Sequence, residues 1–147
     1  MDASTRKYLL VITMSKTLAE FENFPPPFDH FPSRTFRAYC MEVIDGDTFR
    51  LLVDIGFYNF SYVTIRLLDV DTPEIFSPHS PNEFALGMRA KEKVQELIEH
   101  KQVIIATKKD ATTLGRFVAV VSYWNGIGWS DLGTTLKTLK LTKSDII

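Results

Sequence analysis

The stretch that decides the fold, residues 36–68, reads FRAYCMEVIDGDTFRLLVDIGFYNFSYVTIRLL. Three segments in it, Phe36–Ile44, Thr48–Val53 and Phe60–Leu68, are rich in β-branched, aromatic and aliphatic residues, which favour strands. Asp45-Gly46 separates the first two segments and Asp54-Ile55-Gly56 separates the second from the third, and both are typical of tight turns. Strands joined by such short turns predict an antiparallel meander.

The rest of the chain predicts further strands and two helices. A loop over residues 74–81 leads into residues 82–100, where apolar side chains recur at helical spacing. Strands are expected over Gln102–Thr107 and Arg116–Trp124, and a closing helix over residues 130–141 with Ser130 as a candidate N-cap. We therefore expect an α+β, mainly β fold: a five-stranded OB-fold Greek-key barrel with one inserted and one C-terminal helix.

Composition is that of one soluble globular domain. The 147 residues suffice for one hydrophobic core, and 45% of them are apolar and 24% charged. Residues 1–33 differ, because Phe24-Pro25-Pro26-Pro27-Phe28 cannot hold a regular helix or an inner strand. We expect residues 1–33 to be an N-terminal extension lying over the domain of residues 34–147. A docking segment for a polyproline reader is the alternative.

Charge and cysteine content constrain the function classes. A formal net charge of -1 is unusual for a passive nucleic-acid binder, so it favours catalysis at a local site. The lone cysteine, Cys40, excludes an internal disulfide and is expected to be a small buried apolar residue. The apolar run Tyr8–Ile12 is too short to cross a bilayer, and Glu20 and Glu22 lie where a signal peptide would have small residues. We expect a cytoplasmic or otherwise intracellular protein with no membrane partner.

Two acidic clusters and two arginines carry the chemistry: Asp45-Gly46-Asp47-Thr48, Arg66, Asp71-Thr72-Pro73-Glu74 and Gly115-Arg116. Carboxylate oxygens suit a hard divalent cation, and the planar guanidinium of arginine matches the oxygens of a phosphate. The combination is typical of metal-assisted cleavage of a phosphodiester. Taken singly, Asp47 is also an ordinary turn former, and Glu74 and Arg116 are ordinary surface residues.

The order of these motifs resembles the staphylococcal nuclease-like (thermonuclease, SNase-like) family. The resemblance rests on Ile44–Thr48, Ile65–Glu74 and Leu114–Arg116, and it extends from about residue 36 to about residue 141. It implies an OB-fold barrel and a calcium-dependent nuclease that hydrolyses phosphodiester bonds of DNA and of RNA, leaving the phosphate on the 3′ side. We expect it to act as a monomer.

The resemblance assigns the calcium ion to Asp47, Asp71 and the backbone carbonyl of Thr72. From its own position, Asp45 is expected to stabilise the turn that aims Asp47. Asp69 stands where the family is usually apolar. It would either add charge near the metal or point to solvent from the other strand face, and the alternation of strand faces favours solvent.

The resemblance assigns catalysis to Arg66, Glu74 and Arg116. The two arginines would clamp the scissile phosphate, and Glu74 would either deprotonate or orient the attacking water. One departure concerns substrate binding: Thr112-Thr113-Leu114 stands where the family commonly has Asp-Lys-Tyr before Gly-Arg. That change predicts weaker or differently arranged contacts with the substrate.

Two other function classes stay open. The first is a non-catalytic nucleic-acid-binding or protein-interaction OB-fold module, although such members of the family typically lose one or more of the arginine, glutamate or aspartate positions retained here. The second is a structural accessory that docks through residues 1–33, with the barrel as scaffold.

Overall fold

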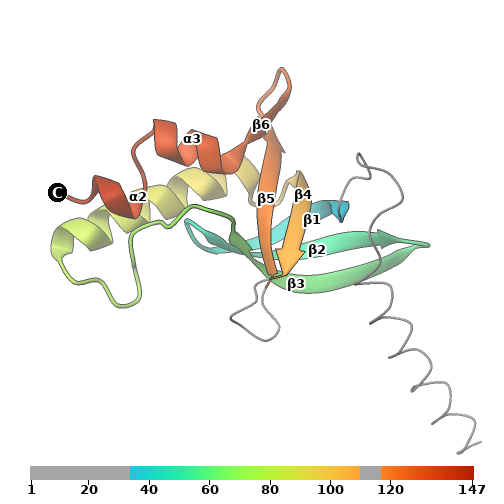
Figure 1. Cartoon of the computed structure of the whole chain (residues 1–147), viewed down its shortest axis with the longest axis horizontal. Coiled ribbons are helices and arrows are strands. Elements are labelled where there is room, and N and C mark those ends of the chain that lie inside the picture. The colour runs from blue at the N-terminus through green and yellow to red at the C-terminus, as the bar shows by residue number, and fades with distance from the viewer. Residues whose placement is uncertain (1–33, 110–116) are drawn as a thin grey trace, which may run out of the picture. The chain divides into compact units, whose positions relative to one another are not determined.

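The described strands form a closed barrel (Figure 1) in a computed structural model that describes residues 34–109 and 117–147. β1 (Thr35–Asp45), β2 (Thr48–Gly56) and β3 (Asn59–Leu67) form the predicted antiparallel meander. β4 (Gln102–Lys109) pairs antiparallel with β1, and β5 (Phe117–Trp124) pairs antiparallel with β4 and parallel with β3. The order β3-β2-β1-β4-β5, closed by β3–β5, confirms the five-stranded OB-type barrel and the mainly β, α+β class.

The inserted helix, α2 (Pro81–Ile98), begins one residue earlier than predicted. Ser80 is its N-cap, with Oγ accepting the backbone N–H of Glu83 at 3.0 Å, and Pro81 occupies the first turn, where no N–H is needed. Its buried face, which includes Ala90, Val94 and Ile98, packs on the barrel. The helix therefore buries one face in the core, as the apolar periodicity predicted.

The C-terminal helix differs from its predicted bounds. Ser130 belongs to a short sixth strand, β6 (Trp129–Asp131), which pairs with β5, so it cannot be the N-cap. Asp131 caps α3 (Leu132–Thr138) instead, accepting the backbone N–H of Thr134 at 2.9 Å. The chain then continues into a 3₁₀ turn, η1 (Lys143–Asp145), rather than extending the helix to residue 141.

Residues 125–128 join β5 and β6 into a hairpin. The side-chain oxygen of Asn125 accepts the backbone N–H groups of Ile127 and Gly128, each at 2.9 Å. At the base of the hairpin Trp124 and Trp129 meet edge to face, with ring centroids 5.7 Å apart. Both rings pack on each other and stay about half exposed.

One hydrophobic core joins the barrel to both helices. Its largest fully buried side chains come from the barrel and from both helices: Phe49, Leu51, Ile65, Val94, Ile98, Val103, Ile105, Val121, Leu132 and Leu136. Cys40 is fully buried within this core, as predicted. α2 and α3 lie side by side (Figure 1), and residues of α2 and of the segment after α3 line one shared pocket.

The predicted N-terminal extension, residues 1–33, lies outside the described residues. So does Arg116, where the fifth strand was expected to begin, and the first described residue of β5 is Phe117. Within the described ranges, no helix combines the length and apolar character needed to cross a membrane.

Candidate functional site

The two predicted acidic clusters meet where the β1–β2 turn lies against the segment that follows β3. Asp45 builds that turn, because its Oδ1 accepts the backbone N–H of Asp47 at 3.1 Å, which is the predicted role. Gly46 lets the two segments approach closely, since a Cβ there would lie 2.7 Å from the Thr72 side chain. The carbonyl of Asp47 also accepts the N–H of Leu67 at 2.8 Å. Segments far apart in sequence are thus joined at this edge.

Asp47 is a buried carboxylate with fixed partners. Its side chain and backbone are together only 7% exposed. Oδ1 accepts the Thr48 hydroxyl at 3.0 Å, and Oδ2 accepts the backbone N–H of Thr72 at 2.9 Å. Thr72 itself is buried and reaches Asp47 through this N–H. These bonds fix the orientation of the carboxylate before any ligand arrives.

Arg66 lies between the two predicted metal ligands. Its Nη2 forms an ion pair with Oδ1 of Asp71 and lies 4.0 Å from Oδ2 of Asp47. Burial alone would lower the pKa of Arg66, but the bond to Asp71 and the charges of Asp47, Asp71 and Asp45 outweigh it and raise the pKa. The guanidinium therefore stays charged, and the Arg66 side chain is 38% exposed to solvent.

Glu74 lies on the loop that precedes α2, and hydrogen bonds to Glu83 of α2 hold this loop in place. Its backbone N–H donates to Oε1 of Glu83 at 3.3 Å, and the N–H of His79 donates to Oε2 of Glu83 at 2.7 Å. The bond from His79, aided by the one from Glu74, lowers the pKa of Glu83 although the residue is buried. An ionised carboxylate thus holds both ends of the loop, while the Glu74 side chain stays 45% exposed.

Glu83 is a residue that the sequence analysis missed. The pattern Ser80-Pro81-Asn82-Glu83 is that of a capping box, which could have placed the start of α2 correctly. It would not have revealed the loop contacts, because in a capping box the glutamate bonds the backbone of the N-cap residue. Here the carboxylate reaches further back along the chain, to Glu74 and His79.

α2 touches the segment after Thr72 at Gly87. A Cβ on Gly87 would lie 2.6 Å from Cγ2 of Ile75 and 2.7 Å from the carbonyl oxygen of Pro73. Only a residue without a side chain allows this approach. The segment that carries Glu74 is therefore packed directly on the helix as well as bonded to it.

Lys143 reaches the same edge from η1. Its backbone N–H donates to the carbonyl of Asp71 at 2.8 Å, and its Nζ lies 3.5 Å from Oε1 of Glu74. No motif surrounds Lys143 in the sequence, so only the folded chain brings it here.

The carboxylates at this edge are of the ligand type that a hard cation such as calcium takes. Oxygens of Asp47 and Asp71 both approach Nη2 of Arg66, so a cation bound between these two carboxylates would take the place that the guanidinium nitrogen holds here. Within residues 34–109 and 117–147 no three Asp, Glu, His or Cys side chains converge as a ready-made cage, so an ion would complete its shell with carbonyl and water oxygens. Burial, followed by the contact with Asp47 and its charge, raises the pKa of Asp45 to about 6. A nearby cation would offset that crowding of negative charge.

Asp69 is exposed, as expected, but for a different reason. β3 ends at Leu67, so the alternation of strand faces no longer applies at Asp69. Its φ of 58° places it in a left-handed turn that directs the chain from β3 into the segment of Asp71. The predicted second arginine, Arg116, lies among residues 110–116, for which the structure gives no description.

Comparison with known families agrees with this geometry. The family model described as "Staphylococcal nuclease homologue" matches residues 64–138, just over half of the 147-residue chain. That span contains Arg66, the segment from Asp71 to Glu74, all of α2 and all of α3. No curated protein matched the chain. With the barrel and the meeting of its acidic clusters, the match establishes that the chain belongs to the staphylococcal nuclease homologue family.

Proposed function

We propose that this protein is a calcium-dependent nuclease that hydrolyses phosphodiester bonds of DNA and RNA and acts as a monomer. The observation that carries the proposal is the placement of Asp47 and Asp71 around the guanidinium of Arg66, with Glu74 on the adjoining loop. Membership of a nuclease family supports the reaction class.

Arg66 and Arg116 would bind the scissile phosphate. Asp47, Asp71 and the carbonyl of Thr72 would hold the calcium ion, which when bound would polarise the phosphate and lower the pKa of a bound water. The exposed guanidinium of Arg66 offers parallel N–H donors to two phosphate oxygens, and it stabilises the charge that develops there. Arg116 would add a second guanidinium.

Glu74 would receive the proton of the attacking water. Its carboxylate is exposed enough to meet water, and its backbone is fixed by Glu83. As the water oxygen attacks phosphorus in line, the bond from phosphorus to the 5′ oxygen breaks, and that oxygen takes a proton from solvent and leaves as a 5′ hydroxyl. The phosphate stays on the 3′ side. A fixed backbone matters because a general base must lie within hydrogen-bond reach of the proton it takes.

Cleavage of a fluorescent single-stranded DNA tests the proposal. Wild-type protein should cut it with calcium and stop when a chelator is added, and the same holds for an RNA of equal length. Glu74→Ala should lower kcat by about 10²–10⁴-fold, the usual contribution of a general base. Glu92→Ala is the matched control, since Glu92 is an exposed glutamate of α2. DNA that is bound but never cut by the wild type would instead favour the binding-module function.

A further inference from the structure

Lys143 is attached to the candidate site through its backbone. The N–H of Lys143 bonds the carbonyl of Asp71 at 2.8 Å, so η1 rests on the segment that also carries Glu74. The turn is closed by Thr142, whose N–H and hydroxyl donate to Oδ2 of Asp145 at 3.0 and 2.6 Å. Because the backbone is anchored twice, the ammonium of Lys143 can only move within the reach of its own side chain.

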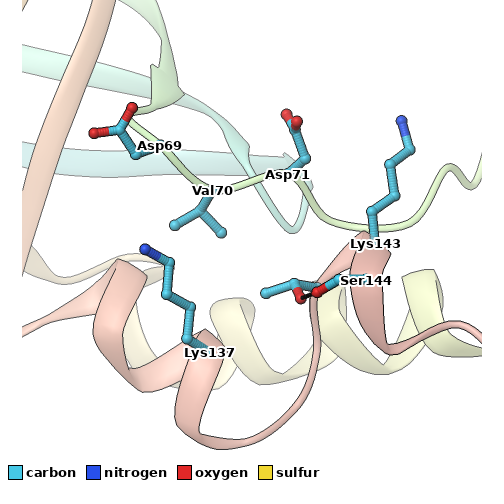
Figure 2. Close-up of a pocket in the computed structure, with 7 residues that line it drawn as sticks. Asp69, Val70, Asp71, Lys137, Lys143 and Ser144 are labelled. Carbon is cyan, nitrogen blue, oxygen red and sulfur yellow. Dashed lines mark hydrogen bonds between the residues drawn. The ribbon is translucent and has the colours of Figure 1, made fainter.

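A pocket of about 360 Å³ opens beside Lys143. Figure 2 shows Asp71 and Lys143 extending in the same direction, one from the segment after β3 and the other from η1. Asp69, Val70 and Lys137 line the neighbouring part of the pocket, so it holds the carboxylate of Asp69 as well as the ammonium of Lys137. The volume lies within the range of about 300–1,000 Å³ that is usual for small-molecule sites. The pocket therefore continues from the candidate site into space that a ligand can fill.

The present partner of the Lys143 ammonium is easily exchanged. The ion pair between Lys143 and Glu74 spans 3.5 Å, and the two side chains are 46% and 45% exposed. Exposed ion pairs contribute little stability, because water competes for both partners. A phosphate oxygen is a good alternative partner, since charge-assisted bonds from ammonium to phosphate are among the stronger hydrogen bonds.

The charge of the candidate site also favours a second cation. Within the part of the chain that the structure describes, it contains the carboxylates of Asp47, Asp71 and Glu74 against the single guanidinium of Arg66. A phosphate of a nucleic-acid strand that comes close to this edge is repelled by that negative charge. The ammonium of Lys143 counters it at the pocket side, where the strand would continue beyond the scissile bond.

We propose that Lys143 binds the substrate by exchanging Glu74 for a non-bridging oxygen of the phosphodiester next to the scissile one, which the adjoining pocket accommodates. The inference rests on the proposed nuclease function.

Three variants test the inference on an oligothymidylate with calcium. Lys143→Gln should raise KM about three- to tenfold, the net effect of losing one typical hydrogen bond. It should also reduce the slope of log KM against log salt by about 0.7, the share of one phosphate contact on a single strand. Lys143→Arg should restore both. Lys93→Gln should change neither, although Lys93 forms a comparable exposed ion pair with Glu96 at 3.1 Å.

Neutral linkages identify the phosphate concerned. A methylphosphonate placed next to the scissile bond should raise KM for the wild type and add nothing further for Lys143→Gln. Equal penalties in both proteins at every position would overturn the inference. So would a Lys143→Gln protein that loses kcat alone, since Lys143 would then act on Glu74 and not on the strand.

Binding measured in chelator separates the two proposals. Fluorescence anisotropy of labelled oligothymidylate gives Kd without turnover. If wild-type protein never cuts, the nuclease function fails, and a Kd that Lys143→Gln raises with a smaller salt slope would still support the phosphate contact. If wild-type protein cuts but KM, Kd and salt slope are the same in Lys143→Gln, the function stands and this inference is wrong.

Discussion

Replacing Gly87 by alanine tests how tightly α2 supports the segment of Glu74. The added Cβ would lie 2.7 Å from the carbonyl oxygen of Pro73, whereas ordinary contact begins at 3.4 Å, so one of the two must retreat by about 0.7 Å. The oxygen belongs to the backbone and cannot rotate away. Overpacking of this kind costs about 1–3 kcal/mol, while glycine to alanine in a helix interior alone gains about 1 kcal/mol. We expect the free energy of unfolding to fall by about 1 kcal/mol.

The same displacement should lower activity without touching a site residue. A misplacement of about 1 Å can cost about 100-fold in rate, so a shift of the segment carrying Glu74 should reduce kcat at least about tenfold. The free energy of unfolding is measured by urea titration followed by circular dichroism, and kcat is measured on the same samples.

Two controls separate packing from helix propensity. Ala85→Gly, at an exposed position of α2, should cost about 1 kcal/mol and calibrates propensity in this helix. Gly128→Ala should be near neutral, since no atom lies within 4 Å of the added Cβ. A Gly87→Ala protein that is more stable by about 1 kcal/mol, with unchanged kcat, would refute the reasoning, because propensity alone predicts that gain.

Two further predictions concern buried groups. Burial raises the pKa of the Cys40 thiol to about 12. The folded protein should therefore resist an aromatic disulfide reagent at pH 8, and the protein unfolded in urea should react with it. Prompt reaction of the folded protein would contradict the burial of Cys40. Glu83→Gln replaces one acceptor oxygen by an NH₂ donor, so the side chain can no longer accept both the N–H of Glu74 and that of His79. Hydrogen exchange at these two amides should accelerate, and kcat should fall by a larger factor than KM changes. Glu92→Gln is the control. Unchanged exchange at both amides would show that Glu83 does not hold the loop.

The meander and the turn of Asp45 could be predicted because their causes are local. Apolar and β-branched residues define the first three strands, and the Asp45-Gly46 turn connects the first two at close range. The second turn was predicted at Asp54-Ile55-Gly56, but those residues extend β2, and the chain reverses at Phe57 and Tyr58, both with positive φ. The side chain of Asp45 bonds a residue two positions away, which is within the reach of sequence reasoning. The inserted helix was found for the same reason, through the spacing of its apolar face.

Other features depend on contacts that are distant in sequence. β6 has three residues, too few to show a strand pattern in the sequence. Ser and Asp both suit the N-cap position of α3, and Asp131 takes it because Ser130 is paired with β5. Lys143 meets Glu74 only because η1 rests on the carbonyl of Asp71. No rule of spacing relates these residues, so the folded chain was needed to find them.

The hairpin of β5 and β6 contains both tryptophans of the chain, at Trp124 and Trp129. Their rings touch edge to face and remain about half exposed, away from the buried core. Tryptophan fluorescence therefore reports on this hairpin and its exposure to water rather than on the hydrophobic core. A soluble quencher should already reach both indoles in the native state. A bound single-stranded nucleic acid that quenches this emission must extend as far as the hairpin, so the fluorescence reports whether the bound strand reaches this part of the surface.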